Sequence, residues 1–335
     1  MIKVSIIIPV IEINDYLRES IPKILKLDNQ DFEIIVLPNK KTNDNWAKTR
    51  VVPTGFSNPS KKRNLGVKKA RGKIIAFLDD DAYPKANWID RALIHFKDKK
   101  IIGVGGPAIT PKNDSILQKA SGAMSESLIG GGKARKRFIS SGKKDFVDDW
   151  PSVNLLVKRD VFIKSGGFDP RYWPGEDTKL CLEITRHGKI IYDPKVIVCH
   201  HRRASLIKHL KQNGNYGLHR GHFARRYPQN SLKLFYLMPS LFVIYLLLVL
   251  TLVILNSLQI LSLKITIHYL LLPLYLYFLL IILDIIIISI RHKNPLVGMA
   301  TIPYIFLTHL YYGIRFIKGY FSNDISKNTH HKKNQ

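Results

Sequence analysis

The chain has 335 residues, which is enough for one large domain with an appendage or for two ordinary domains. Its 52 Lys and Arg residues outnumber its 25 Asp and Glu residues, and the formal net charge of +27 favours an anionic partner: nucleic acid, acidic lipid or a phosphorylated substrate. The two cysteines, Cys181 and Cys199, lack the spacing of a disulfide framework or a cysteine zinc site, so the sequence supports neither class.

The N-terminal part of the chain alternates between predicted strands and predicted helices. Its opening residues lack the basic head, long apolar centre and cleavage site of a signal peptide. Apolar runs predict strands in VSIIIPV at 4–10, FEIIVLP at 32–38, KIIAFLD at 73–79 and KIIGVGG at 100–106. Helical spacing of apolar residues marks a helix at 13–27, and a Pro near the start and a Gly at the end mark another at 57–72. This alternation predicts an α/β domain with a mostly parallel sheet and helices on both faces, in which ligands bind beyond the carboxyl ends of the strands.

Three consecutive carboxylates, Asp79, Asp80 and Asp81, come directly after the apolar run at 74–78. Many acidic triplets are only solvated turns. Here the triplet caps a predicted strand, and the Tyr-Pro pair that follows is expected to end the element at once. Crowded carboxylates suit Mg²⁺ or Mn²⁺, which prefer oxygen ligands and bridge to substrate phosphates. We therefore expect a divalent cation that holds a diphosphate.

Four segments occur in an order and spacing typical of one known family. They are VSIIIPV, KKRNLGVKKARGKIIAFLDDDAYP, GGFDPRYWPGEDTKLCLEITRHG and VCHHRRASL. In this combination the first 210 residues or so resemble glycosyltransferase family two. The resemblance implies a GT-A catalytic domain (a Rossmann-like α/β fold) over residues 1–205. It also implies transfer of a sugar from a nucleotide diphosphate donor, with inversion at the anomeric carbon.

The resemblance implies a donor site around the acidic triplet. Asp79 matches the family's contact to the nucleoside, Asp81 matches the metal ligand that closes its DxD motif, and Asp80 could share either role. The other nucleotide-sugar contacts implied are Pro9, Glu12, Arg63 and Asn64, of which Arg63 could also meet the diphosphate. Where the family usually has an aspartate that recognises the base, this chain has Asn39, so the base stays open.

A second acidic motif, Glu176 and Asp177 in WPGEDTKLCLEI, opens a predicted helix. One alternative is purely structural, because acidic residues in the first turn stabilise a helix dipole by about 0.3–1 kcal/mol. The resemblance implies instead that Asp177 is the general base that accepts the proton of an acceptor hydroxyl. Glu176 would position the acceptor. General base catalysis of this kind contributes about 10²–10⁴ in rate.

A histidine pair and two arginines follow KIIYDPKVIV, which we interpret as a single strand. An imidazole can complete an Asp-rich divalent site, and the resemblance implies that His200, rather than His201, binds the metal. Arg202 and Arg203 could bind the leaving diphosphate bidentately. Alternatively, they form a juxtamembrane basic patch attracted to anionic lipid at about 1 kcal/mol per charge.

Two basic segments have no obvious catalytic role. SLIGGGKARKRF at 127–138 contains three glycines and four cations, but it lacks the Gly-Lys-Ser/Thr ending of a phosphate loop. We expect a mobile loop there, either near the acceptor or at the membrane surface. Residues 206–232 are predicted to form a basic amphipathic juxtamembrane segment that lies on the membrane and is interrupted at Gly214 and Gly217.

The C-terminal part is predicted to be a membrane region, because about 20 consecutive apolar residues span a bilayer core. The membrane region covers 233–320 and contains predicted spans at 235–255 and 265–290. A third segment at 295–314 either spans the membrane or lies in the interface, and a polar tail follows at 321–335. Asp284 is the only charge inside the second span. Cations precede the first span and follow the second, so the positive-inside rule predicts a cytoplasmic catalytic domain.

Three functions compete at this point. The leading one is an integral membrane glycosyltransferase with Mn²⁺ or Mg²⁺ as cofactor, which moves a sugar from a nucleotide-sugar donor to a hydroxyl of a lipid-linked or cell-surface glycan. The alternative is a polyprenyl-phosphate sugar synthase, whose acceptor is already ionised and needs no base. A noncatalytic protein bound to nucleic acid or to the membrane surface would explain the charge. No recognised nucleic-acid-binding motif accompanies the basic residues, so we expect no nucleic-acid partner.

Overall fold

The computed structural model describes residues 2–260 and 267–325. The chain divides into two compact units, of which the first contains 2–113 and 136–201 and the second contains 114–135 and 202–325. The sequence gives no sign that 114–135 belongs with the C-terminal helices. Parts of the predicted second span and of the predicted polar tail lie outside the described residues.

The first unit contains an eight-stranded sheet in the order β3-β2-β1-β4-β9-β6-β10-β8 and a three-stranded sheet in the order β5-β11-β7. The strands are β1 Val4–Pro9, β2 Phe32–Leu37, β3 Thr49–Val51, β4 Ile74–Phe77, β5 Ala82–Pro84, β6 Ile101–Gly105, β7 Ala108–Ile109, β8 Asp145–Val147, β9 Leu155–Lys158, β10 Lys189–Tyr192 and β11 Val198–His200. In the larger sheet, four of the seven pairings are parallel, and the three that involve β8 or β9 are antiparallel. The mostly parallel sheet of the prediction is confirmed.

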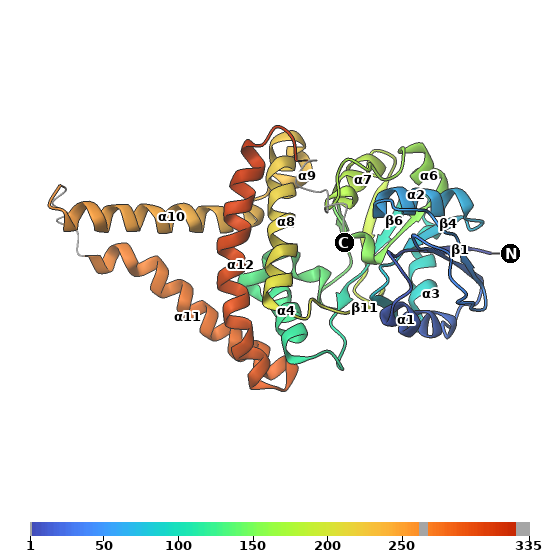
Figure 1. The fold of residues 1–335 in the computed structure, drawn as a ribbon, viewed down its shortest axis with the longest axis horizontal. Helices are drawn as coiled ribbons and strands as arrows, with labels where there is room; N and C mark the ends of the chain where they lie inside the picture. Colours follow the sequence, from blue (N-terminus) through green and yellow to red (C-terminus); the bar gives the residue numbers. More distant parts are fainter. Residues whose placement is uncertain (1, 261–266, 326–335) are drawn as a thin grey trace. The chain divides into compact units, whose positions relative to one another are not determined.

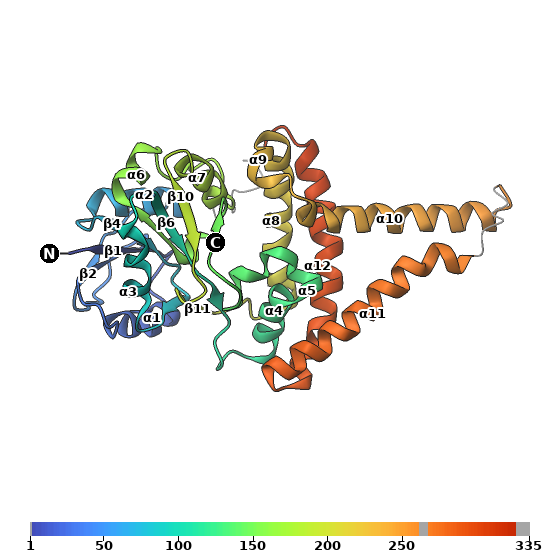
Figure 2. The same cartoon turned by 180° about the vertical axis from the view of Figure 1, so that it is seen from behind.

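Helices cover both faces of the larger sheet (Figures 1 and 2). The helices of this unit are α1 Asp15–Leu25, α2 Pro59–Lys69, α3 Trp88–Leu93, η1 His95–Lys97, η3 Ser152–Asn154, α6 Arg159–Lys164 and α7 Glu176–Ile184. Ile6 and Ile8 of β1 pack in one core with α1 and α3, whereas Ile7 packs in the other core with α2, α6 and α7. Because both faces are buried, the strands are continuous apolar runs. The predicted α/β class with helices on both faces of the sheet is confirmed.

Two predicted strand boundaries are wrong. KIIYDPKVIV forms two strands in different sheets, β10 and β11, rather than one. Pro194 has no N–H to donate to a ladder, and the Asp193 carboxylate accepts a hydrogen bond from the Lys195 N–H at 2.8 Å, so the chain turns there. The Tyr-Pro pair after the acidic triplet does not end the element either, because it belongs to β5, which pairs with β11.

The second unit is entirely helical in its described part. Its helices are α4 Ile116–Glu126, α5 Leu128–Gly131, α8 Leu206–Arg226, α9 Pro228–Ser231, α10 Leu234–Ser257, α11 Ile267–His292 and α12 Pro295–Phe321, and η2 Gly132–Arg137 contains the boundary with the first unit. The Gly-rich segment predicted as a mobile loop therefore forms the short helices α5 and η2. Residues 206–226 form one uninterrupted helix, so the predicted interruption at Gly214 and Gly217 is wrong.

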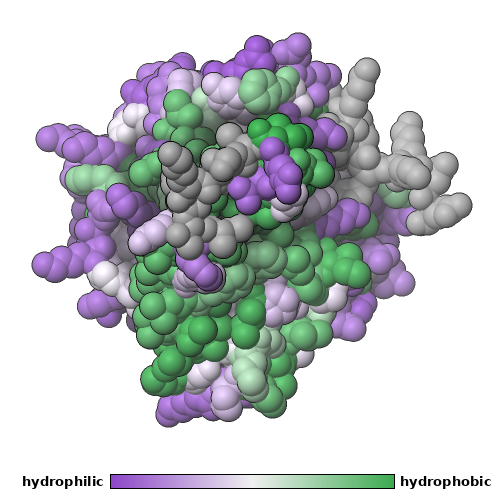
Figure 3. Space-filling view, turned by 90° about the vertical axis from the view of Figure 1, so that its left-hand side faces the viewer, coloured by the Kyte–Doolittle hydropathy of each residue, from purple (hydrophilic) through white to green (hydrophobic). Residues whose placement is uncertain are grey.

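Two described helices are long and apolar enough to cross a membrane, Leu234–Ser257 and His268–His292. The third predicted segment lies in α12, which runs beside α8 across the base of these two helices (Figure 1). Among the described helices, α12 is not one of the two candidate spans. Figure 3 views the molecule from the side toward which α10 and α11 extend, and it shows a broad hydrophobic area there.

Glycines allow α8 and α12 to approach closely. A Cβ atom at Gly217 would lie 2.6 Å from the backbone oxygen of Tyr312, and one at Gly221 would lie 2.0 Å from that of Phe316. On α12, a Cβ at Gly319 would lie 1.9 Å from the backbone oxygen of Leu218. Gly217, one of the two glycines that suggested a helix interruption, therefore belongs to the contact surface between two helices.

Gly221→Ala is expected to destabilise the second unit, although alanine normally favours a helix over glycine by about 0.5–1 kcal/mol. The new methyl group meets backbone atoms that cannot rotate away, and such overpacking costs about 1–3 kcal/mol. The midpoint of thermal unfolding of the full chain in detergent measures the balance. Lys211→Ala, at an exposed position of the same helix, is the control. An unchanged or raised midpoint for Gly221→Ala would contradict the tight contact.

Candidate active site

Two carboxylates of the acidic triplet meet a histidine from a neighbouring strand. β4 runs beside β1, and the triplet follows β4 where the Leu78 N–H donates to the Ile7 carbonyl at 3.2 Å. β11 pairs with β5, which brings His200 opposite Ala82, and Nε2 of His200 lies 3.0 Å from Oδ1 of Asp81. Candidate ligand atoms of Asp79, Asp81 and His200 all lie within 4.8 Å of one another.

Two carboxylates and one imidazole fit a hard divalent cation such as Mn²⁺. The sequence predicted Asp81 and His200 as the ligands, and the structure brings these two together. Asp79, predicted as a nucleoside contact, lies close enough to be a third ligand. The crowding of like charges in the triplet is therefore consistent with a bound cation.

Asp80 turns toward α1. The Nδ2 amide of Asn14 donates to its carboxylate at 2.5 Å, and the Ser20 hydroxyl donates to its backbone carbonyl at 3.3 Å. Burial, with the negative charge of Asp81 next in importance, raises the pKa of Asp80 to about 6. Asn14 also caps α1 by accepting from the Leu17 N–H at 2.9 Å. Sequence reasoning missed Asn14, although a cap residue so soon after the first strand was a usable signal.

Arg63 joins the acidic triplet to the second acidic motif. It is only 4% exposed, and its two terminal nitrogens donate to Asp79 Oδ1 at 2.7 Å and to Glu176 Oε1 at 2.8 Å. The sequence predicted Arg63 as a donor contact. In the structure its guanidinium bridges two carboxylates that are 97 residues apart in the chain (176 − 79), and the donor contact stays a prediction. A planar fork of donors is suited to such a bridge.

Arg63→Lys is expected to destabilise the first unit by about 1.5–3 kcal/mol, the usual worth of a hydrogen bond to a charged group. An ammonium keeps the charge, but it is a single point that cannot serve both carboxylates with the same geometry. Denaturant unfolding of the full chain measures the change. Arg18→Lys is the control, because Arg18 is exposed and its two ion pairs are 3.4 Å long. Equal stability of the two variants would show that the bridge is unimportant.

Glu176 and Asp177 begin α7 directly after Gly175, whose φ of 111° is a conformation that favours glycine. Glu176 is 5% exposed, and burial raises its pKa to about 7 although Arg63 opposes that shift. Asp177 is half-buried, and its carboxylate accepts from the Ser152 N–H at 3.4 Å and from the Thr178 N–H at 2.8 Å. Asp177 is therefore the more accessible of the two carboxylates, as a general base must be.

His201 contacts the acidic triplet through its backbone and α1 through its side chain. Its backbone N–H donates to the Asp81 carbonyl at 3.0 Å, and its ring lies 3.1 Å from Glu19 and packs against Tyr16 with ring centroids 4.8 Å apart. The first contact joins the end of β11 to the acidic triplet, and the other two join it to α1. No local pattern in the sequence connects Glu19 or Tyr16 with position 201.

The predicted nucleotide contacts Pro9, Glu12 and Asn39 lie at or just beyond the ends of β1 and β2. Pro9 ends β1 and is buried, whereas Glu12 is exposed beyond it. The Lys62 ammonium donates to the Val10 carbonyl and, at 2.6 Å, to Oδ1 of Asn39. Burial lowers the pKa of Lys62 to about 8. Lys62 is a buried cation that the sequence analysis did not single out.

Three other predicted donor residues have different surroundings. Both amide atoms of Asn64 bond the Phe168 backbone, with distances of 2.7 and 2.9 Å. Arg202 and Arg203 belong to the second unit, where the Arg202 N–H donates to the Asp114 carboxylate at 3.3 Å. Contact of Arg202 and Arg203 with a diphosphate stays a prediction, as does donor binding by Asn64.

Comparison with known proteins finds similarity to glycosyltransferases. A family model described as "Glycosyl transferase family 2" matches residues 5–150. The chain is 26% identical over 174 residues to the pre-mycofactocin glycosyltransferase of Mycobacterium tuberculosis, covering 52% of this chain but only 36% of that protein. It is 22% identical over 259 residues to the "Dolichyl N-acetyl-alpha-D-glucosaminyl phosphate 3-beta-D-2,3-diacetamido-2,3-dideoxy-beta-D-glucuronosyltransferase" of Methanococcus voltae, covering 69% of this chain and 77% of that protein.

One solved structure that aligns with part of this chain is the mannosyltransferase of Pyrobaculum calidifontis in complex with GDP-Man and Mn²⁺. It aligns with a TM-score of 0.49 and 16% identity, covering 67% of this chain and 64% of that chain.

Proposed function

We propose that the chain is a glycosyltransferase of family 2, whose model matches residues 5–150, and that its first unit transfers a sugar from a nucleotide diphosphate donor. The acceptor is a hydroxyl of a lipid-linked or other glycan, and the anomeric carbon is inverted. The observation that carries the proposal is the cluster of Asp79, Asp81 and His200, whose candidate ligand atoms lie within 4.8 Å of one another. The Arg63 bridge joins this cluster to the second acidic motif.

The metal would be held by Asp81 and His200, with Asp79 beside them. A bound Mn²⁺ or Mg²⁺ supplies positive charge that stabilises the leaving nucleoside diphosphate. Arg63 keeps Asp79 and Glu176 in place from the buried side of the site. Asp80, bonded to Asn14, fixes the triplet to α1.

The chemistry at the acceptor rests on Asp177. The acceptor oxygen bonds to the anomeric carbon while the bond from that carbon to the diphosphate oxygen breaks, and the hydroxyl proton passes to the Asp177 carboxylate. One displacement of this kind inverts the anomeric carbon. The half-buried carboxylate of Asp177 supports this role, whereas Glu176 is bonded to Arg63 and fits a positioning role.

The relatives support a lipid-linked or glycan acceptor without naming one for this chain. The name of the Methanococcus voltae relative describes transfer to a sugar on dolichyl phosphate, that is, to a lipid-linked sugar. The chain spans 36% of the pre-mycofactocin glycosyltransferase and 18% of the O-antigen biosynthesis protein RfbC of Myxococcus xanthus. Their activities are therefore proposals for this chain.

A panel of nucleotide sugars tests the proposal. Purified full chain with Mn²⁺ or Mg²⁺ is expected to hydrolyse one donor slowly and to release its nucleoside diphosphate, because water replaces the acceptor. Addition of membrane lipid extract should accelerate release and transfer the sugar to a lipid-soluble product. Absence of both binding and turnover for every donor would reject the function.

The membrane topology follows from the distribution of cations. With the catalytic unit in the cytoplasm, single cysteines at Arg203 and Arg291 should react only from the cytoplasmic side. A cysteine at the exposed Gln259, after the first candidate span, should react only from the other side. Labelling of intact cells with a membrane-impermeant reagent distinguishes these cases. Reaction of position 291 from outside would contradict a pair of spans.

A further inference from the structure

The short helix α5 is held against α11 by an aspartate in the apolar part of α11. Asp284 is 3% exposed, and its two carboxylate oxygens accept from the backbone N–H groups of Leu128 at 3.3 Å and Ile129 at 3.0 Å. N–H groups at the start of a helix have no partner within the helix. A carboxylate inside an apolar span is rare and is normally paired, and α5 supplies that pairing.

The contact fixes the level of α5 along α11. Asp284 precedes Arg291 by seven residues, which is about 10 Å along a helix that rises 1.5 Å per residue. Arg291 and His292 end the apolar stretch and lie 3.9 and 3.1 Å from the Glu126 carboxylate at the end of α4. Cations at the end of a span mark the headgroup region. α5 therefore lies at the level where headgroups give way to acyl chains.

The backbone N–H groups of α5 have the protein partners that a position in lipid requires. In lipid, each N–H group needs an internal partner. Leu128 and Ile129 donate to Asp284, the Gly130 N–H donates to the Ser127 hydroxyl at 2.6 Å, and the Gly131 N–H donates to the Ser127 carbonyl at 3.1 Å. The glycines are required for this tight turn. A Cβ at Gly131 would lie 2.1 Å from the Ser125 carbonyl oxygen.

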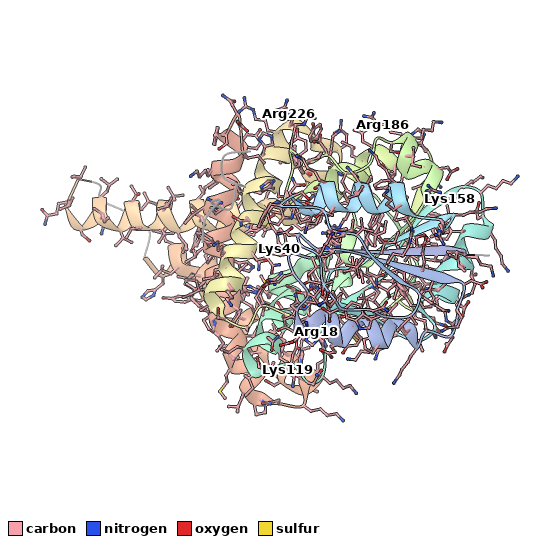
Figure 4. The ribbon with its side chains drawn as sticks, turned by 45° about the vertical axis from the view of Figure 1, so that its right-hand side comes forward. Arg18, Lys40, Lys119, Lys158, Arg186 and Arg226 are labelled. Carbon is pink, nitrogen blue, oxygen red and sulfur yellow. The ribbon has the colours of Figure 1, made fainter. Side chains whose placement is uncertain are left out.

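α4 and α5 also leave apolar side chains exposed. Small residues of α4 pack in clusters with α11 and α12. Ile116 and Leu117 in the first turn of α4, and Leu128 in α5, are 41%, 47% and 52% exposed. Lys119, labelled in Figure 4, comes two residues after Leu117 in α4, so this helix carries a cation beside its apolar residues. Apolar side chains next to cations are typical of a helix in a membrane interface.

We propose that the α4–α5 segment, residues 114–131, is a membrane-inserted element whose exposed Ile116, Leu117 and Leu128 enter the lipid leaflet in which α11 ends. The occupant of this surface is phospholipid, because the surface continues the exposed apolar surface of α11 on either side of Asp284. Leu283 and Ile287 there are 49% and 42% exposed. The proposal is independent of the glycosyl transfer.

Three single-cysteine variants of the full chain test it, at positions that are each 52% exposed: Leu128→Cys, Leu279→Cys in α11 and Ile94→Cys in the first unit. The natural cysteines are buried. Each variant carries an environment-sensitive fluorophore in nanodiscs of phosphatidylcholine and phosphatidylglycerol, with or without lipid that bears a nitroxide near the top of the acyl chain. Positions 128 and 279 should show blue-shifted emission that the nitroxide quenches, and position 94 should show neither.

Emission at position 128 that resembles position 94 would overturn the proposal. Blue-shifted emission that the nitroxide leaves unquenched would also overturn it, because protein, such as a second copy of the chain, would then cover Leu128. The anchor is tested by adding Asp284→Leu to the Leu128→Cys and Leu279→Cys variants. Quenching should be lost at 128 and kept at 279, and quenching kept at both would remove Asp284 as the anchor.

Discussion

Asp177→Asn is expected to lower the turnover number about 10²–10⁴-fold while donor and metal binding stay intact. The loss corresponds to about 3–5 kcal/mol of transition-state stabilisation. An amide cannot accept the proton of the acceptor hydroxyl, but its oxygen can still accept a hydrogen bond from the Ser152 or Thr178 N–H. Turnover with the donor found in the panel, together with donor affinity by calorimetry, measures the effect.

Asp160→Asn is the matched control, because Asp160 is also an acidic residue in the first turn of a helix. If both aspartates only stabilise helix dipoles, the two variants should behave alike, with a loss of about 0.3–1 kcal/mol in stability and none in turnover. Near-normal turnover for Asp177→Asn would remove Asp177 as the base. It would favour a polyprenyl-phosphate sugar synthase, whose acceptor is already an anion.

The meeting of Asp81 and His200 was predictable because both residues lie next to elements that the sequence marks clearly. Asp81 follows an apolar run that forms β4, and His200 ends a short apolar run before a basic segment. The carboxyl ends of neighbouring strands gather ligand-binding residues. The motif therefore indicated both residues even though the strand before His200 was assigned incorrectly.

Contacts between distant segments were not predictable from local pattern. The Arg63 bridge needs α2, the end of β4 and the start of α7 to converge, and no period or cap residue indicates that convergence. The N–H groups that pair with Asp284 are likewise more than 150 residues away from it (284 − 129 = 155). A glycine is ambiguous in the same way, because it favours a break in an isolated helix but permits close packing between two helices. Gly221 in α8 does the latter.

Removal of the metal is expected to abolish transfer, and Asp81→Asn is expected to weaken Mn²⁺ affinity by at least about 100-fold, since loss of even an outer-shell partner costs about 10–100-fold. Asp81 is 8% exposed and lies 3.0 Å from His200. A neutral amide at position 81 binds the cation more weakly than a carboxylate, so His200 loses its charged partner in holding the metal. Electron paramagnetic resonance of free Mn²⁺, titrated with full chain and nucleoside diphosphate, measures affinity independently of activity.

The three aspartates of the triplet should differ in this titration. Asp80 is bonded to Asn14 at 2.5 Å and turned toward α1, so Asp80→Asn should affect Mn²⁺ affinity much less than Asp81→Asn. Asp79 shares Arg63 with Glu176, so Asp79→Asn should weaken both Mn²⁺ binding and the bridge, and it should also lower stability. Asp90→Asn, at an exposed carboxylate, is the control. Full transfer in excess chelator, or equal Mn²⁺ affinity for Asp81→Asn and Asp90→Asn, would contradict a metal held by Asp81 and His200.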